Sequence, residues 1–359
     1  MIEIKVPARI CFYGDHQDYL GLPVIAGTID RYINLKASPN TDDRYLLRLL
    51  DLEAETSIAL NDDLKQIQSD DYFRSVMAVL KKQGFQFDQG YDIEISGNIP
   101  VNAGLSSSSA LVVAWIRFLV ETQGKSKEIS DYQIGRWAYE AEVMFFDQPG
   151  GLMDQYTIAQ KGLIYIDTRN GESTRLNANL GKLLVAESGV PKKTLEVLKN
   201  ARVYAQKAVD AVKKVHPELE LQRATLTDYE KYVDLVPEEL QGYWYATIYN
   251  YHITLEAKKE LLKQNPDIQL LGDLMNQHQI ILQNEIKNTP LEMVEMMDAA
   301  RNAGATGTKI IGSGGGGCMV AMVTEDMEEN IKYLLFLILF YNLVLENRIH
   351  LLHNHHLEK

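Results

Sequence analysis

The chain has little cysteine and no excess of positive charge. Two of its 359 residues are cysteines, Cys11 and Cys318, and the N-terminus lacks the basic and apolar regions of a signal peptide. We therefore expect a cytoplasmic protein. Acidic residues outnumber basic ones by 49 to 36, which gives a formal net charge of −13. This balance disfavours nucleic acid as a partner, so a phosphate-bearing ligand would have to meet a local loop and not a basic surface.

Long hydrophobic runs are also absent. The most apolar stretch, Tyr333 to Tyr341, is too short to span a bilayer, and no other segment indicates a membrane protein. The tail from His350 to His356 is rich in histidine, which could bind metal adventitiously, and we assign it no role. With 359 residues, of which 46% are apolar, the chain is long enough to form two domains with a real core.

The most informative stretch runs from Ile99 to Ala110 and contains Gly104-Leu105-Ser106-Ser107-Ser108-Ser109. It follows an alternating strand pattern and precedes a helix pattern that is apolar from Ala110 to Val120. A glycine followed by small hydroxyl residues leaves the first helical N–H groups open to an anion, and serine hydroxyls can bind Mg²⁺. We therefore predict a phosphate loop. The alternative is a serine-rich helix cap or a flexible linker.

Polar residues also cluster near the N-terminus. Asp15, His16 and Asp18 follow Gly14 at the end of a predicted strand. Short acids and an imidazole placed there can converge on the hydroxyls of a small polar ligand. For His16 alone, the alternative is an ordinary surface histidine.

A second pair of candidates lies in the middle of the chain. Gly150 and Gly151 come just before Asp154, and Glu142 lies on the helix predicted from Asp131 to Phe146. Two glycines open the backbone beside a carboxylate, which favours a functional aspartate. An ordinary acid in the first turn of a helix fits the pattern equally well.

The C-terminal half is mostly helical, with breaks at Pro and Gly. The predicted helices cover residues 191–215, 228–236, 238–262, 268–287 and 291–303. Near the end, a run from Gly312 to Gly317 separates two apolar strands. Glycines between elements that must pack indicate a close backbone approach and not a linker.

Three of these stretches resemble the signatures of the GHMP kinases, the family of galactokinase, mevalonate kinase and homoserine kinase. The phosphate loop resembles the second signature, Gly14-Asp15-His16-Gln17-Asp18-Tyr19 is similar to the sugar-holding signature of galactokinases, and the glycine run is similar to the third signature. The three occur in the family's order over nearly the whole chain. Galactokinases carry Glu where this chain has Asp15, which leaves the identity of the sugar open.

The resemblance implies an α+β fold with an N-terminal domain of the ribosomal protein S5 domain 2 type, residues 1–178. It implies a ferredoxin-like and helical C-terminal domain, residues 179–359, and an active site in the cleft between them. It also implies a role for each matching residue. These are catalysis by Asp154 with Arg9; sugar binding by Asp15, His16, Asp18 and Gly151; ATP binding by Gly104, Leu105, Ser106, Ser107, Ser108 and Ser109; and Mg²⁺ binding by Ser108 and Glu142.

Three functions are consistent with these features. The first is an ATP-dependent kinase that acts on a sugar hydroxyl, and the favoured acceptor is the anomeric C1 hydroxyl of galactose or a related monosaccharide. The polar cluster fits this function, since a polyhydroxyl ligand needs several fixed hydrogen-bond partners. A mevalonate kinase-like or heptose kinase-like enzyme is the second. A non-catalytic sugar sensor is the third, and the intact serines and Asp154 argue against it. Monomer and homodimer both stay open.

Overall fold

The computed structural model describes residues 1–100, 103–178, 180–191 and 194–335. Val101 and Asn102 of the predicted phosphate-loop stretch lie outside the described residues, as do most of the apolar run from Tyr333 to Tyr341 and the whole histidine-rich tail. Within the described part, no helix is long and apolar enough to cross a membrane.

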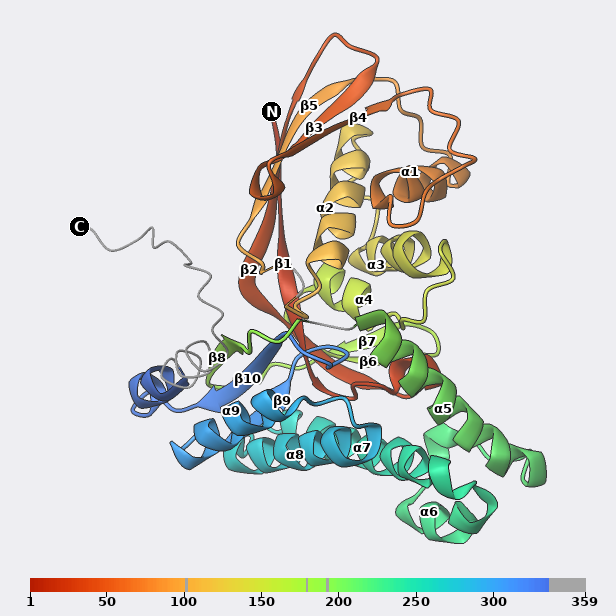
Figure 1. Ribbon diagram of the computed structural model, residues 1–359. Helices are drawn as coiled ribbons and strands as arrows, with labels where there is room; N and C mark the ends of the chain where they lie inside the picture. The colour runs from red at the N-terminus through yellow and green to blue at the C-terminus, as the bar shows by residue number, and fades with distance from the viewer. Residues whose placement is uncertain (101–102, 179, 192–193, 336–359) are drawn as a thin grey trace.

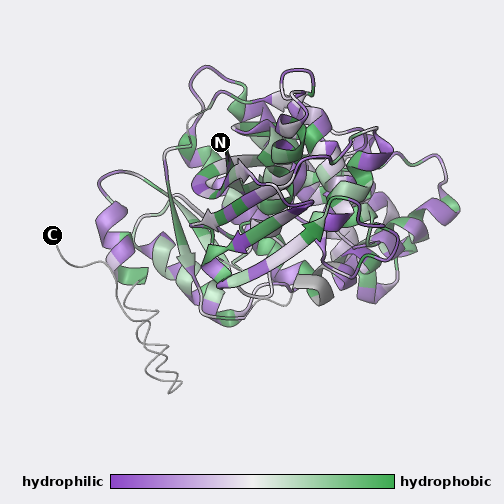
Figure 2. Cartoon of the chain, turned by 90° about the horizontal axis from the view of Figure 1, so that it is seen from above, coloured by the Kyte–Doolittle hydropathy of each residue, from purple (hydrophilic) through white to green (hydrophobic). Residues whose placement is uncertain are grey.

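The N-terminal half is built on a seven-stranded sheet. Its spatial order is β4-β3-β5-β2-β6-β7, with β1 paired to β2. The strands are β1 (Ile2–Tyr13), β2 (Val24–Pro39), β3 (Arg44–Leu49), β4 (Ala54–Ala59), β5 (Tyr91–Gly97), β6 (Leu163–Asp167) and β7 (Glu172–Arg175). The pairs are antiparallel except for β3 with β5. Side chains on β5 alternate between buried and more exposed over its first residues. Figure 2 shows hydrophilic and hydrophobic bands along the strands of the sheet.

Among the described residues, four α-helices belong to this half: α1 (Tyr72–Lys82), α2 (Ser107–Thr122), α3 (Asp131–Tyr139) and α4 (Met153–Gln160). Helices α1, α2 and α3 lie on one side of the long strands (Figure 1). Ten of the 16 residues of the central helix α2 are buried, and its Trp115 packs edge-on against Tyr45 of β3 at 5.2 Å between ring centroids. Because α2 packs in the core, its N-terminus is held in place where the phosphate loop ends.

One predicted helix differs from the structure. The pattern from Asp131 to Phe146 predicts a continuous α-helix, but the chain changes to a π-helical turn over Glu140–Met144. The extra residue in such a turn rotates the side chains that follow it, and π-turns are frequent at functional sites. This turn carries Glu142, which is 7% exposed.

The C-terminal half combines a three-stranded antiparallel sheet with long helices. The sheet order is β8-β10-β9. Its elements are β8 (Lys182–Glu187), α5 (Thr194–Val215), α6 (Leu226–Tyr232), α7 (Gln241–Leu261), α8 (Ile268–Ile281), α9 (Leu291–Asn302), β9 (Gly307–Ile310) and β10 (Cys318–Val323). Helices α7, α8 and α9 lie along the lower side of the molecule in Figure 1. All five predicted helices are present, although three of them include a 3-10 or π-helical turn at one end.

The two halves are joined through buried polar contacts. The Tyr13 hydroxyl at the end of β1 donates to the Leu271 carbonyl at 2.6 Å, and the Cys318 N–H at the start of β10 donates to the Ala103 carbonyl at 3.0 Å. The second contact ties the glycine run to the phosphate loop. We keep the domain boundary after residue 178 as a proposal; β7 ends at Arg175 and β8 begins at Lys182.

Candidate functional site

A cavity of about 600 Å³ collects nearly all of the predicted site residues. Arg9, the N-terminal polar cluster, the phosphate loop, Glu142, Gly151 and Asp154 line it, together with Gly312 and Ser313 of the glycine run. Leu105 is the exception, because its side chain is 2% exposed and packs in the hydrophobic core. A cavity of this size falls in the usual range for small-molecule sites.

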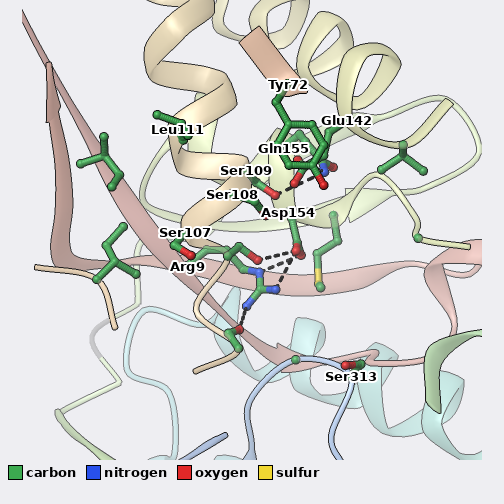
Figure 3. Close-up of a pocket in the computed structure, with 18 of the residues that line it drawn as sticks. Arg9, Tyr72, Ser107, Ser108, Ser109, Leu111, Glu142, Asp154, Gln155 and Ser313 are labelled. Atoms are coloured by element: carbon green, nitrogen blue, oxygen red, sulfur yellow. Dashed lines mark hydrogen bonds and ion pairs between the residues drawn. The ribbon is translucent and has the colours of Figure 1, made fainter. Parts of the chain in front are cut away.

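Arg9 and Asp154 form the centre of the cavity wall (Figure 3). Arg9 Nε donates to Asp154 Oδ1 and Arg9 Nη2 donates to Asp154 Oδ2, each at 2.7 Å. Arg9 Nη1 donates to the Gly104 carbonyl at 2.8 Å. Burial lowers the pKa of Arg9, but the charge and hydrogen bonds of Asp154 outweigh it and raise that pKa overall. One buried guanidinium therefore fixes both the Asp154 carboxylate and the phosphate loop.

Asp154 lies in the first turn of α4, as one of the two sequence interpretations expects. The preceding Gly151 allows a close contact, since a Cβ at this position would lie 1.9 Å from Asp18 Oδ2. Gly151 therefore lets the Asp18 side chain approach the loop before α4. Burial and the nearby charge of Asp154 raise the pKa of Asp18 to about 7.

The phosphate loop ends at the N-terminus of α2. Ser107, Ser108 and Ser109 form the first turn of this helix, and all three line the cavity. The first N–H groups of a helix have no partner within it, and its N-terminal end carries a partial positive charge. This end of the cavity therefore suits an anion, and α2 holds it in place.

Glu142 faces the same helix terminus. The Gln155 side-chain amide donates to Glu142 Oε2 at 2.7 Å and contacts Ser109 Oγ at 3.4 Å (Figure 3). Burial raises the pKa of Glu142, while the hydrogen bonds from Gln155, Ser109 and Ser108 oppose that shift. The sequence analysis missed Gln155, because adjacent residues on a helix point in different directions and its partner Glu142 lies on another helix.

The Asp15 carboxylate is paired with Lys309, a second residue that the sequence analysis missed. Lys309 on β9 is fully buried, and its ammonium donates to Asp15 Oδ2 at 2.8 Å and to the Cys11 and Ile310 carbonyls. Burial raises the pKa of Asp15, but Lys309 and His278 lower it more, so the net shift is downward. Oδ1 of the same carboxylate is buried and has no hydrogen-bond partner. A lysine inside an apolar strand is the sequence signal that was available, because such a residue needs a buried partner.

His16 links the N-terminal cluster to the glycine run. Its Nε2 lies 2.9 Å from the Ser313 carbonyl and 3.1 Å from Asn288 Nδ2. A hydrogen on Nε2 bonds the carbonyl, whereas a lone pair on Nε2 accepts from the amide, so the partner depends on the tautomer of His16. The Tyr19 hydroxyl lies 3.4 Å from Nδ1. Asn288 Nδ2 also donates to the Ser313 carbonyl, at 3.1 Å. His16 has a positive φ of 61°, which few non-glycine residues adopt.

The site therefore combines the N-terminus of α2, which suits an anion, with two carboxylates. Glu142 lies beside this helix end, and Asp154 lies between it and the polar cluster at the N-terminus. Such a site can hold a phosphorylated ligand and orient a hydroxyl toward it.

Comparisons with known proteins show which family the chain resembles. The model for the GHMP kinases N terminal domain matches residues 71–162, and the model for the GHMP kinases C terminal region matches residues 257–333. A galactokinase of Clostridium acetobutylicum is 29% identical over 335 residues, which cover 89% of this chain and 84% of that protein.

Solved structures share the fold. The galactokinase of Lactococcus lactis complexed with galactose superposes with a TM-score of 0.85 at 21% identity, covering 95% of this chain and 90% of its own. The mevalonate kinase of Methanococcus jannaschii reaches 0.68 at 20% identity, covering 92% and 93%. With both family models matched in order and the predicted motifs gathered in one cavity, the chain belongs to the GHMP kinase family.

Proposed function

We propose that this protein transfers the γ-phosphoryl group of ATP to a hydroxyl of galactose or a closely related monosaccharide, at the anomeric C1 position. The observation that carries the proposal is the position of Asp154. It is paired with Arg9 in the cavity wall, beside the anion-binding end of α2 and next to the Asp18 carboxylate. The relation to galactokinases over most of the chain supports the choice of sugar.

The nucleotide fits the end of the cavity nearest β5. Apolar side chains line this end, and they are Ile33, Leu49, Ile95, Ile99 and Leu111. A flat purine base can bury its faces against such side chains, while its phosphates reach the N-terminus of α2. The loop from Gly104 to Ser109 is our proposed phosphate cradle, with Leu105 contributing only backbone.

Ser108 and Glu142 are the residues that would hold Mg²⁺. The Ser108 hydroxyl and the Glu142 carboxylate offer the hard oxygen ligands that this ion prefers. The burial of Glu142 supports this role, because burial disfavours its charged form and a neighbouring cation would offset that cost. The ion would neutralise phosphate charge that no lysine or arginine on the phosphate loop can offset.

The sugar fits the opposite side, against Asp15, His16, Asp18 and Gly151. In the reaction, the acceptor oxygen attacks the γ-phosphorus, its proton passes to Asp154, and the bond from the γ-phosphorus to the bridging oxygen breaks to release ADP. The transition state is loose, so orientation of the hydroxyl contributes as much as basicity. Arg9 keeps the Asp154 carboxylate in one orientation with two parallel hydrogen bonds.

A coupled assay of ADP formation tests the proposal. The panel contains galactose, glucose, mannose, N-acetylgalactosamine, a heptose phosphate and mevalonate. We expect turnover with galactose or one of its close relatives. Turnover with mevalonate or the heptose phosphate would select one of the other kinase classes. Binding of a sugar without turnover on any acceptor would indicate a sensor.

A further inference from the structure

Ser106 has a backbone conformation that serine seldom adopts. Its φ of 60° and ψ of 51° place it in the left-handed region, at the N-cap of α2. An N-cap serine normally accepts a hydrogen bond from its own helix, but Ser106 makes no such side-chain bond. Glycine would adopt this conformation without strain and is nearly as good at the N-cap. The hydroxyl is therefore what serine adds at this position.

That hydroxyl points at the proposed base. Ser106 Oγ donates to Asp154 Oδ2, the same oxygen that accepts from Arg9 Nη2. Arg9 also holds the carbonyl of Gly104, two residues before Ser106. The phosphate loop therefore contacts the Asp154 carboxylate directly through Ser106 and indirectly through Arg9. Strained residues persist where the surrounding structure fixes them, and they occur preferentially at functional sites.

We propose that Ser106 is a positioning residue for Asp154, a role that rests on the proposed kinase function. Its hydroxyl and Arg9 together hold the carboxylate toward the acceptor, while the Ser106 backbone stays in the phosphate cradle. The orientation of the base is thereby set by the same loop that binds the nucleotide. The competing role is direct binding of the nucleotide, in which the Ser106 hydroxyl would leave Asp154 and bind a phosphate oxygen of ATP.

Two substitutions separate the hydroxyl from the strain. Ser106→Gly removes both, and Ser106→Ala removes only the hydroxyl. We expect both variants to lose about 10- to 100-fold in single-turnover rate, the usual effect of one hydrogen bond to a charged group. Ser106→Ala should unfold at a lower temperature than Ser106→Gly, because alanine keeps the left-handed strain. Lys287→Gly is the control: Lys287 is also left-handed, with φ 58°, but it does not line the cavity, so its rate should equal that of the parent.

Affinity decides between the two roles. Calorimetry with a non-hydrolysable ATP analogue and with galactose should give dissociation constants within about twofold of the parent for both Ser106 variants. A tenfold loss of analogue affinity would overturn the proposal in favour of direct nucleotide binding. Rates that differ between Ser106→Gly and Ser106→Ala would also overturn it, because strain and not the hydroxyl would then control the rate.

A double-mutant cycle gives the final test. In the Asp154→Asn background, Ser106→Gly should lower the single-turnover rate by less than about twofold, because a positioning residue acts only through the base that it positions. An unchanged 10- to 100-fold effect in that background would refute the coupling. Failure of the kinase proposal looks different: the parent protein would turn over no acceptor, or Asp154→Asn alone would leave the rate intact.

Discussion

Arg9 and Asp154 come from opposite ends of the N-terminal half and meet through two hydrogen bonds of equal length, 2.7 Å. The guanidinium plane matches the two carboxylate oxygens, which is the strongest geometry for this kind of pair. Arg9 is nearly inaccessible to solvent, while Asp154 keeps a quarter of its side-chain surface facing the cavity. The arginine therefore orients the carboxylate, which is the more exposed of the two groups in the cavity wall.

The first prediction concerns Asp154. Asp154→Asn keeps the shape of the side chain but removes its ability to take a proton, so we expect turnover to fall on the order of 10²- to 10⁴-fold. Folding and the affinities for ATP and sugar should stay close to those of the parent. Single-turnover kinetics measure the effect. Asp167→Asn is a matched control, because Asp167 also pairs with an arginine, Arg169, outside the cavity. A chemical step within a few-fold of the parent would make Asp154 a structural residue.

The second prediction concerns the metal. Ser108→Ala and Glu142→Ala should raise the Mg²⁺ concentration needed for half-maximal turnover. Gln155→Leu should weaken metal binding about 10- to 100-fold, because an amide that orients a ligand affects affinity at this scale. Titration of Mn²⁺ by electron paramagnetic resonance, with a non-hydrolysable ATP analogue present, gives a readout independent of turnover. Gln160→Leu on the same helix α4 is the control. Unchanged Mn²⁺ affinity in Glu142→Ala would remove Glu142 from the metal site.

The third prediction separates the two ligands. His16→Ala should weaken sugar binding by about tenfold or more, because the imidazole lines the cavity and holds Ser313 beside the polar cluster. The affinity for ATP should change by less than about twofold. Calorimetry with each ligand checks this, and His252→Ala, which loses a comparable bond to the Ala224 carbonyl, is the control. Equal losses for both ligands would move His16 out of the acceptor site.

The fourth prediction concerns the buried pair beneath the site. Lys309→Met leaves the Asp15 carboxylate buried without its partner, which should cost about 3–5 kcal/mol of unfolding free energy at pH 7. In the parent, the folded pKa of Asp15 is lowered. The stabilisation is therefore fully present above the unfolded pKa of about 3.9 and is lost as the pH falls through the folded pKa.

Urea unfolding across pH tests the pair. The deficit of Lys309→Met should shrink at acidic pH, where Asp15 becomes protonated. Lys182→Met, which breaks an exposed pair with Glu328, should change stability little. A loss in Lys309→Met that stays constant from pH 3 to pH 8 would mean that lost packing, and not the unpaired charge, causes the instability.

The fifth prediction concerns Asp18. Its folded pKa of about 7 lies above the unfolded value of about 3.9, so the native state binds more protons between these pH values. Folding stability should therefore fall as the pH rises from about 4 to 7. Asp18→Asn should remove this penalty, with a gain in melting temperature that is larger at pH 8 than at pH 5, while sugar binding weakens. A gain that does not depend on pH would show that Asp18 carries no such penalty.

The sequence by itself determined the chemistry that is local in the chain. The phosphate loop, the cluster from Asp15 to Asp18, and Asp154 after two glycines are each contained in a few consecutive residues. The helices were predictable for the same reason, because periodicity and caps are local signals. The family and its two-domain fold followed from the order of these motifs.

Only the tertiary structure decided how distant residues meet. Lys309 and Asp15 are 294 positions apart, and Gln155 on α4 donates to Glu142, which lies in the π-helical turn after α3. The apolar end of the cavity is assembled from β2, β3, β5 and α2, whose leucines and isoleucines look like ordinary core residues in the sequence. The direction of the Ser106 hydroxyl depends on one left-handed residue. Such contacts depend on how the sheets and helices pack, and no local pattern of residue types encodes that.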